Sequence, residues 1–94
     1  MISLNADLQL KPGAGPELEK TFREVFRPAI SAQPGFSDVA LLRSASEADS
    51  YRLVIEFQTE ELRLKWAATD LHQQVWPQMK AHCADVSLKH FAVV

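Results

Sequence analysis

The stretch Phe36–Gln58, FSDVALLRSASEADSYRLVIEFQ, lies in the middle of the chain and reads as two strands joined by a polar turn. Phe36 to Arg43 has the composition of a strand, and Ser44 to Ser50 is a run of small and polar residues typical of a hairpin connection. The second strand pattern, Tyr51 to Gln58, alternates with period two. It places four apolar side chains on one face: Tyr51, Leu53, Ile55 and Phe57.

A strand and a helix are expected before this hairpin. Residues 2–10 alternate with period two, so one face of that strand is apolar. Pro16 suits the first position of a helix, and Pro34-Gly35 ends it. Pro28 lies inside this helix and offers no N–H to the Glu24 carbonyl, which predicts a kink or a loose last turn.

A helix and a strand are expected after the hairpin. Thr59 is a good helix cap, and Asp70 followed by Gln73 resembles a second helix start. The pattern therefore predicts a broken helix, roughly 60–68 and then 71–82, with Pro77 bending the second piece. Residues 86–93 form the closing strand.

The order β-α-β-β-α-β predicts one α+β domain over residues 1–94, a ferredoxin-like sandwich. Its four-stranded antiparallel sheet is expected in the order 4-1-3-2. Right-handed crossovers then place both helices on one face of the sheet.

Composition excludes several classes of protein. The net charge is −2 with no basic patch, so nucleic acid is not an expected partner. The apolar runs are too short to span a membrane, and no signal peptide is expected at the N-terminus. The single cysteine, Cys83, cannot form an internal disulfide, which agrees with a reducing cytoplasm.

The helix-free face of the sheet carries a set of mostly charged or amide side chains. An antiparallel sheet tolerates water on one face, so a solvated surface is one interpretation. A second molecule covering the face is the other. The predicted face contains these polar residues: Asn5, Asp7, Gln9, Arg52 and Glu56.

The chain resembles the antibiotic biosynthesis monooxygenase (ABM) domains of the dimeric α/β-barrel group. The resemblance covers nearly the whole chain and rests on four stretches: Lys11-Pro12-Gly13, Pro34-Gly35-Phe36, Ile55-Glu56-Phe57-Gln58-Thr59-Glu60-Glu61 and Trp66-Ala67-Ala68-Thr69-Asp70-Leu71-His72. It implies a homodimer in which two helix-free sheet faces form a barrel. Charged groups inside such a barrel need partners, so Arg52 is expected to pair with Asp7 or Glu56.

The second helical region carries the residues best suited to chemistry. His72 and Trp76 are four apart and share a helix face, and Trp66 precedes the break. An apolar cavity for a flat aromatic ligand would be lined by Trp66, Trp76, Phe22, Phe26, Tyr51 and Phe57. The alternative is that these aromatics simply fill the core. No metal site is expected, because His82 and Cys83 diverge on a helix.

The resemblance implies two kinds of chemistry. Some superfamily members degrade haem with an asparagine, a tryptophan and a histidine ligand; those positions hold Ala6, Trp66 and Trp76 here, so haem degradation is disfavoured. Others oxidise polyphenols with O₂ and no cofactor, which requires a base, and His72 is the candidate. The expected function is a cofactor-independent monooxygenase acting on a small aromatic or quinone-like compound. The alternatives are a non-catalytic dimeric small-molecule binding module and a structural dimer whose cavity is filled.

Overall fold

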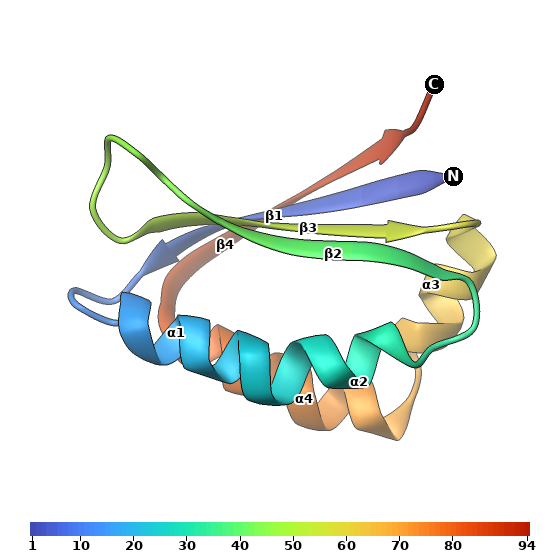
Figure 1. Cartoon of the computed structure of the whole chain (residues 1–94), viewed down its shortest axis with the longest axis horizontal. Helices are drawn as coiled ribbons and strands as arrows, with labels where there is room; N and C mark the ends of the chain where they lie inside the picture. The colour runs from blue at the N-terminus through green and yellow to red at the C-terminus, as the bar shows by residue number, and fades with distance from the viewer.

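One face of a four-stranded antiparallel sheet is covered by helices in the computed structural model, which describes all 94 residues (Figure 1). The strands are β1 (Ile2–Leu10), β2 (Phe36–Arg43), β3 (Ser50–Phe57) and β4 (Cys83–Ala92). Their order, β2-β3-β1-β4, confirms the predicted ferredoxin-like topology. β3 begins one residue and β4 three residues earlier than expected, because pairing with neighbouring strands extends them beyond the local pattern.

The first helical region is irregular close to where Pro28 predicts it. It consists of α1 (Gly15–Thr21), a π-helical turn η1 (Phe22–Phe26) and α2 (Arg27–Ser31). Within it the Arg27 N–H donates to the Phe22 carbonyl, five residues back. Pro28 cannot donate to the Glu24 carbonyl, and its ring crowds that oxygen, so the wider turn relieves both problems. The loose turn therefore precedes the proline rather than ending the helix.

The second helical region is broken, as predicted, into α3 (Glu60–Ala67) and α4 (Asp70–Lys80). Thr59 caps α3 by accepting a hydrogen bond from the Leu62 N–H at 3.1 Å. The expectation that Asp70 caps the second piece is wrong. Thr69 is the cap, accepting from the His72 N–H at 3.1 Å, and its hydroxyl donates to the Trp66 carbonyl at 2.8 Å. Asp70 instead lies in the first turn.

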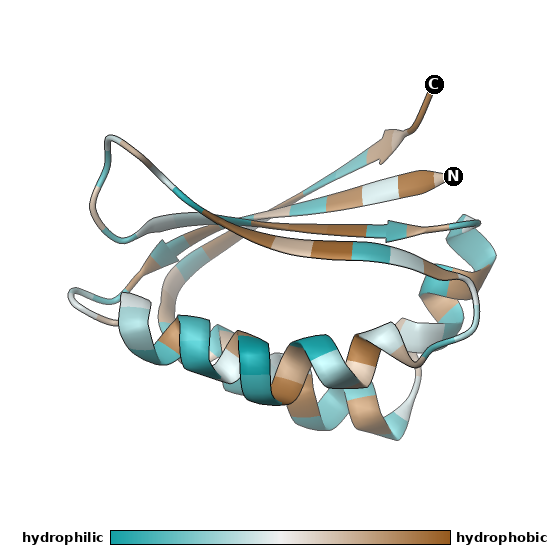
Figure 2. Ribbon diagram, in the orientation of Figure 1, coloured by the Kyte–Doolittle hydropathy of each residue, from teal (hydrophilic) through white to brown (hydrophobic).

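The core lies between the sheet and the helices. Apolar and polar residues alternate along β1 in Figure 2, and the buried positions of β1 and β3 are apolar. None of the helices is long and apolar enough to span a bilayer. Apart from Gly15, the buried residues all carry apolar or aromatic side chains: Ala6, Leu8, Leu10, Leu18, Phe22, Phe26, Ile30, Tyr51, Leu53, Ile55, Phe57, Trp66, Val75 and Met79.

The helix-free face carries an ion cluster that crosses three strands. Asp7 lies opposite Arg52, and the Arg52 Nε donates to the Asp7 Oδ1 at 2.7 Å. The Lys89 Nζ lies 3.3 Å from the Asp7 Oδ2. The hydrogen bond from Arg52 lowers the pKa of Asp7 below its ordinary value. The predicted pairing of Arg52 with Asp7 is therefore confirmed within one chain.

Candidate functional site

Four of the aromatic side chains singled out from the sequence meet where η1, α3 and α4 converge. The Phe26 ring lies 6.3 Å from Trp66 and 6.2 Å from Trp76, measured between centroids, and both contacts are edge-to-face. The His72 imidazole packs on Trp66 at 5.1 Å. These four side chains, which we call the aromatic cluster, link the break between α3 and α4 to the core.

The remaining three predicted ligand-binding residues lie elsewhere. Phe57 packs edge-to-face against Phe36, with ring centroids 6.0 Å apart. Phe22 lies under the Arg27 guanidinium at 5.5 Å, and Tyr51 is bound to Glu19. All three still belong to the same buried core as Phe26 and Trp66, and their specific contacts are with other side chains.

Exposure separates the members of the aromatic cluster by role. Phe26 and Trp66 are buried, with 1% and 3% of their surface accessible, so they act as core residues. Trp76 and His72 are only half-buried, one turn apart on α4. A ligand approaching from solvent therefore meets Trp76 and His72 first.

The His72 imidazole has the properties of a neutral base. Burial lowers its pKa below the ordinary value, and the nearby positive charge of Arg63 lowers it further. The Gln73 side-chain amide lies 3.3 Å from Nδ1 and also donates to the Ala67 carbonyl at 2.9 Å. An amide NH₂ only donates, so Nδ1 accepts and the neutral ring carries its proton on Nε2. Gln73 therefore competes with a substrate for the lone pair of His72.

A groove of about 330 Å³ opens between α4 and β4 beside this cluster. Its size is at the lower end of the range for small-molecule sites. Trp76 forms one wall, and His72 lies one turn back on α4 and outside the lining. The opposite wall belongs to β4, where Leu88 faces the helices opposite Ala6 but stays 53% exposed. The groove is lined by Trp76, Lys80, Cys83, Ala84, Asp85, Val86 and Leu88.

Sequence reasoning did not identify Lys80 as part of this site. Lys80 is four residues after Trp76, as Trp76 is four residues after His72, so the spacing would have indicated a common helix stripe. The first lining residues of β4 were also not identified from the sequence. The strand pattern begins at Val86, whereas β4 begins at Cys83.

Tyr51, on β3, belongs to a separate polar cluster with Glu19 of α1 and Arg43 of β2. Its hydroxyl donates to the Glu19 Oε2 at 2.5 Å, and the Arg43 Nη2 contacts both Glu19 oxygens at 2.8 Å. The Tyr51 and Arg43 bonds lower the pKa of Glu19, while burial, followed by the bond to Glu19, raises the pKa of Tyr51. This network holds Tyr51 as a structural residue.

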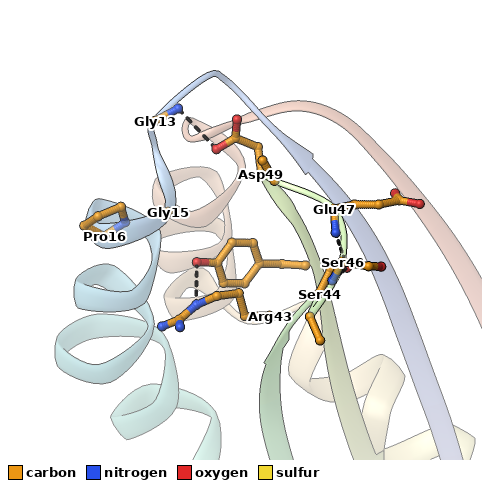
Figure 3. Close-up of a pocket in the computed structure, with 11 residues that line it drawn as sticks. Gly13, Gly15, Pro16, Arg43, Ser44, Ser46, Glu47 and Asp49 are labelled. Carbon is orange, nitrogen blue, oxygen red and sulfur yellow. Dashed lines mark hydrogen bonds between the residues drawn. The ribbon is translucent and has the colours of Figure 1, made fainter.

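A second pocket of about 320 Å³ adjoins that network and is shown in Figure 3. It lies under the β2–β3 loop, where the Gly13 N–H donates to the Asp49 Oδ1 at 3.2 Å. Of the predicted site residues it contains only Tyr51. The α4–β4 groove, which is lined by Trp76, one turn after His72 on α4, is therefore the better candidate site.

The positions that the resemblance links to haem degradation can also be placed. Ala6 is buried, faces the helix layer and carries no polar atom. Asn5 lies on the opposite face, where its Oδ1 accepts from the Ser3 hydroxyl at 3.1 Å. No group of three or more metal-ligating side chains is present.

Two solved structures illustrate the likeness of the fold. SnoaB, a cofactor-independent oxygenase from Streptomyces nogalater, superposes with a TM-score of 0.86 at 16% identity, covering 99% of this chain and 92% of SnoaB. A MhuD mutant with two manganese protoporphyrin IX molecules per active site gives a TM-score of 0.78 at 27% identity, covering 100% of this chain and 95% of MhuD.

Similarity in sequence extends to a characterised protein and to a family. A mycobilin-producing heme oxygenase of Mycobacterium tuberculosis is 34% identical over 67 residues. The match covers 71% of this chain and 62% of that protein, so the chain spans less than two thirds of the relative's length. The model of the antibiotic biosynthesis monooxygenase family matches residues 1–78. With that match over most of its length, the chain belongs to the antibiotic biosynthesis monooxygenase (ABM) family.

Proposed function

We propose that this chain is a cofactor-independent monooxygenase that acts on a small aromatic or quinone-like compound. The observation that carries the proposal is the half-buried Trp76 wall of the α4–β4 groove, one turn from a histidine whose pKa is lowered. Family membership supports the same kind of reaction. The groove supplies a flat apolar surface, and His72 supplies a base.

The chemistry places two demands on the protein. A base must remove a proton from a phenol or an activated C–H group, so that the substrate itself can reduce O₂. Converting a CH₂ group and O₂ into a carbonyl group and water balances without another reductant. The apolar side chains around Trp76 would limit water near the anion. His72 is neutral near pH 7 and can take the proton when Gln73 releases Nδ1.

Oxygen uptake with a panel of quinols and hydroxynaphthalenes tests this proposal. We expect uptake above background, reduced about 100-fold by His72→Gln, the order of magnitude for losing a general base. The matched control is His82→Gln, because the His82 Nε2 is hydrogen-bonded to the hydroxyl of Thr21 on α1 at 3.0 Å. No uptake by the wild-type protein, or equal uptake by both variants, would contradict the proposal.

A non-catalytic binding module is the second outcome of the same experiment. Native mass spectrometry of the purified protein would then show a retained small molecule, without oxygen uptake when that molecule is supplied. The groove volume of about 330 Å³ allows such a ligand without any base. Retention of a ligand without turnover would thus favour binding over catalysis.

Haem is a second candidate ligand because of the heme oxygenase relative. The resemblance expects an asparagine where this chain has Ala6, whose side chain has no polar atom. It expects a histidine where this chain has Trp76, which cannot ligate iron. We therefore expect a hemin titration to give no histidine-ligated Soret band. A one-to-one Soret change that disappears in His72→Ala would make His72 the ligand and favour haem chemistry.

We also infer that the helix-free face of the sheet binds a second copy of the chain. Leu42 and Phe91 point outwards on that face and are 51% and 49% exposed. Around them lies the cluster of Asp7, Arg52 and Lys89, whose charges already compensate one another in part. A homodimer would cover the apolar residues without leaving Asp7 unpaired.

A further inference from the structure

The rim of the α4–β4 groove carries a lysine that no other part of the fold uses. Lys80 is exposed at the end of α4, one turn after Trp76, and lines the groove. It takes part in none of the five ion pairs of the structure. A cation in the last turn of a helix is stabilised by the helix dipole. That gain explains a lysine in the last turn but not its place beside an aromatic wall.

Other charged and titratable groups surround the same end of the groove. Burial raises the pKa of the Cys83 thiol, and the positive charges of Lys11 and Lys80 oppose that rise, so both ammonium groups act on this part of the site. Asp85, the only carboxylate of the lining, forms no ion pair and lies opposite Gln9, so its side chain belongs to the helix-free face of the sheet. The charged side chain on the helix side of the groove is therefore that of Lys80.

We propose that Lys80 binds the oxyanion of a phenolic ligand whose ring lies on Trp76, so that the groove selects phenolates over neutral aromatics. This assignment rests on the proposed function, because it places the ligand in the same groove. The β4 side chains that face the groove, Val86 and Leu88, are apolar, so Lys80 on α4 is the partner for the oxygen. A groove of about 330 Å³ admits one or two fused rings and is too small for a peptide segment.

The proposal has a consequence for protonation. An ammonium group next to the bound oxygen favours its charged form, so the phenol pKa falls on binding. The O–H bond breaks, its electron pair stays on the oxygen, and the proton passes to solvent. No oxidant is consumed in this step. Lys80 would thus prepare the anion that a cofactor-free reaction with O₂ requires.

The test compares two probes of the same shape, 4-nitrophenol and 4-nitroanisole, at a pH where 4-nitrophenol is ionised. We expect the wild-type protein to bind 4-nitrophenolate roughly three- to tenfold more tightly than the ether, the range for a partly exposed charge-assisted hydrogen bond. Lys80→Met should weaken the binding of 4-nitrophenolate alone, so that the two dissociation constants become similar.

Lys65→Met is the matched control, since Lys65 is an exposed lysine on α3 whose charge lies 3.9 Å from Glu61. It should leave the ratio unchanged, and circular dichroism checks that every variant is folded. Equal binding of the two probes by the wild-type protein, binding of neither, or a ratio that survives Lys80→Met would overturn the proposal.

Oxygen uptake measured on the same proteins separates this proposal from the enzymatic one. A phenolate preference that depends on Lys80, in a protein that consumes no oxygen, supports the ligand assignment and contradicts the oxygenase. Oxygen uptake accompanied by an unchanged ratio in Lys80→Met contradicts the ligand assignment alone.

Discussion

At the scale of single residues, His72 shows how a small change of surroundings prepares a side chain for proton transfer. Its ring is half-buried against Trp66, and Arg63 adds a like charge whenever the ring is protonated. Both effects favour the neutral imidazole. The protonation state that a base requires is therefore a result of packing rather than of a dedicated acid partner.

The same pKa shift makes stability depend on pH. The folded-state pKa of His72 lies below its ordinary value of 6.5, so the unfolded chain binds more protons between the two values. The contribution of the neutral ring is complete above 6.5 and is lost as the pH falls below it. Between about pH 7 and pH 5 the wild-type melting temperature should fall more than that of His72→Gln. Parallel melting curves would contradict this reading.

Gly15 shows a second effect at the residue scale. A Cβ at this position would lie 2.7 Å from the Tyr51 hydroxyl oxygen, so Gly15→Ala must displace the hydroxyl that bonds Glu19. We expect a loss of about 1–3 kcal/mol in the free energy of unfolding, as for overpacked sites. Urea denaturation measures it.

Tyr51→Phe provides the control, because it removes the oxygen that the new Cβ would meet. In that background Gly15→Ala should cost clearly less than in the wild type. An equal cost in both backgrounds would mean that the clash with the hydroxyl is not the cause.

At the scale of elements, the break between α3 and α4 positions the candidate base. Thr69 joins the two helices, since its hydroxyl accepts from the His72 N–H and donates to the Trp66 carbonyl. Gln73 spans the same break by bonding the Ala67 carbonyl. The contact of His72 with Trp66 thus depends on how one helix ends and the next begins.

Removing the Thr69 cap should therefore lower the free energy of unfolding and alter the contact of His72 with Trp66. Thr69→Ala should lower the free energy of unfolding by about 1 kcal/mol, the usual cost of a lost N-cap. Asp70→Ala should cost only a few tenths of a kcal/mol, roughly, because Asp70 acts through the helix dipole alone. Thermal or urea denaturation of both variants checks this. A larger loss of stability for Asp70→Ala than for Thr69→Ala would mean that Asp70, and not Thr69, caps α4.

At the scale of the whole molecule, the sheet has one face covered by helices and one face open. The open face combines apolar residues with the ion cluster around Asp7, and we propose that two such faces meet in a homodimer. The α4–β4 groove lies on the helix side of the sheet, so dimer formation through the open face would leave its lining in place.

Sedimentation tests the dimer directly. At micromolar concentration we expect a particle of twice the 10.6 kDa chain mass. Leu42→Glu should dissociate it, because a carboxylate would be buried without a partner. Leu64→Glu is the control, since Leu64 is 54% exposed on α3, away from the sheet. A wild-type monomer, or equal dissociation by both variants, would contradict the dimer.

The sequence alone predicted the order of the elements, the strand faces and the break in the second helical region. These features are local: strand alternation, the Thr59 cap and the missing N–H of Pro28 act within a few residues. The resemblance to barrel-forming domains led to the expectation that Arg52 pairs with Asp7 or Glu56, and the structure pairs it with Asp7.

The tertiary structure decided which side chains meet. The contact of Phe57 with Phe36, the bond from Tyr51 to Glu19 and the groove lined by Trp76 join residues far apart in the chain. Their distances follow from the packing of α1 and α4 on the sheet and from the early start of β4. Periodicity assigns a residue to a face, but only packing between elements determines which neighbour that face contacts, and the candidate site is built from such contacts.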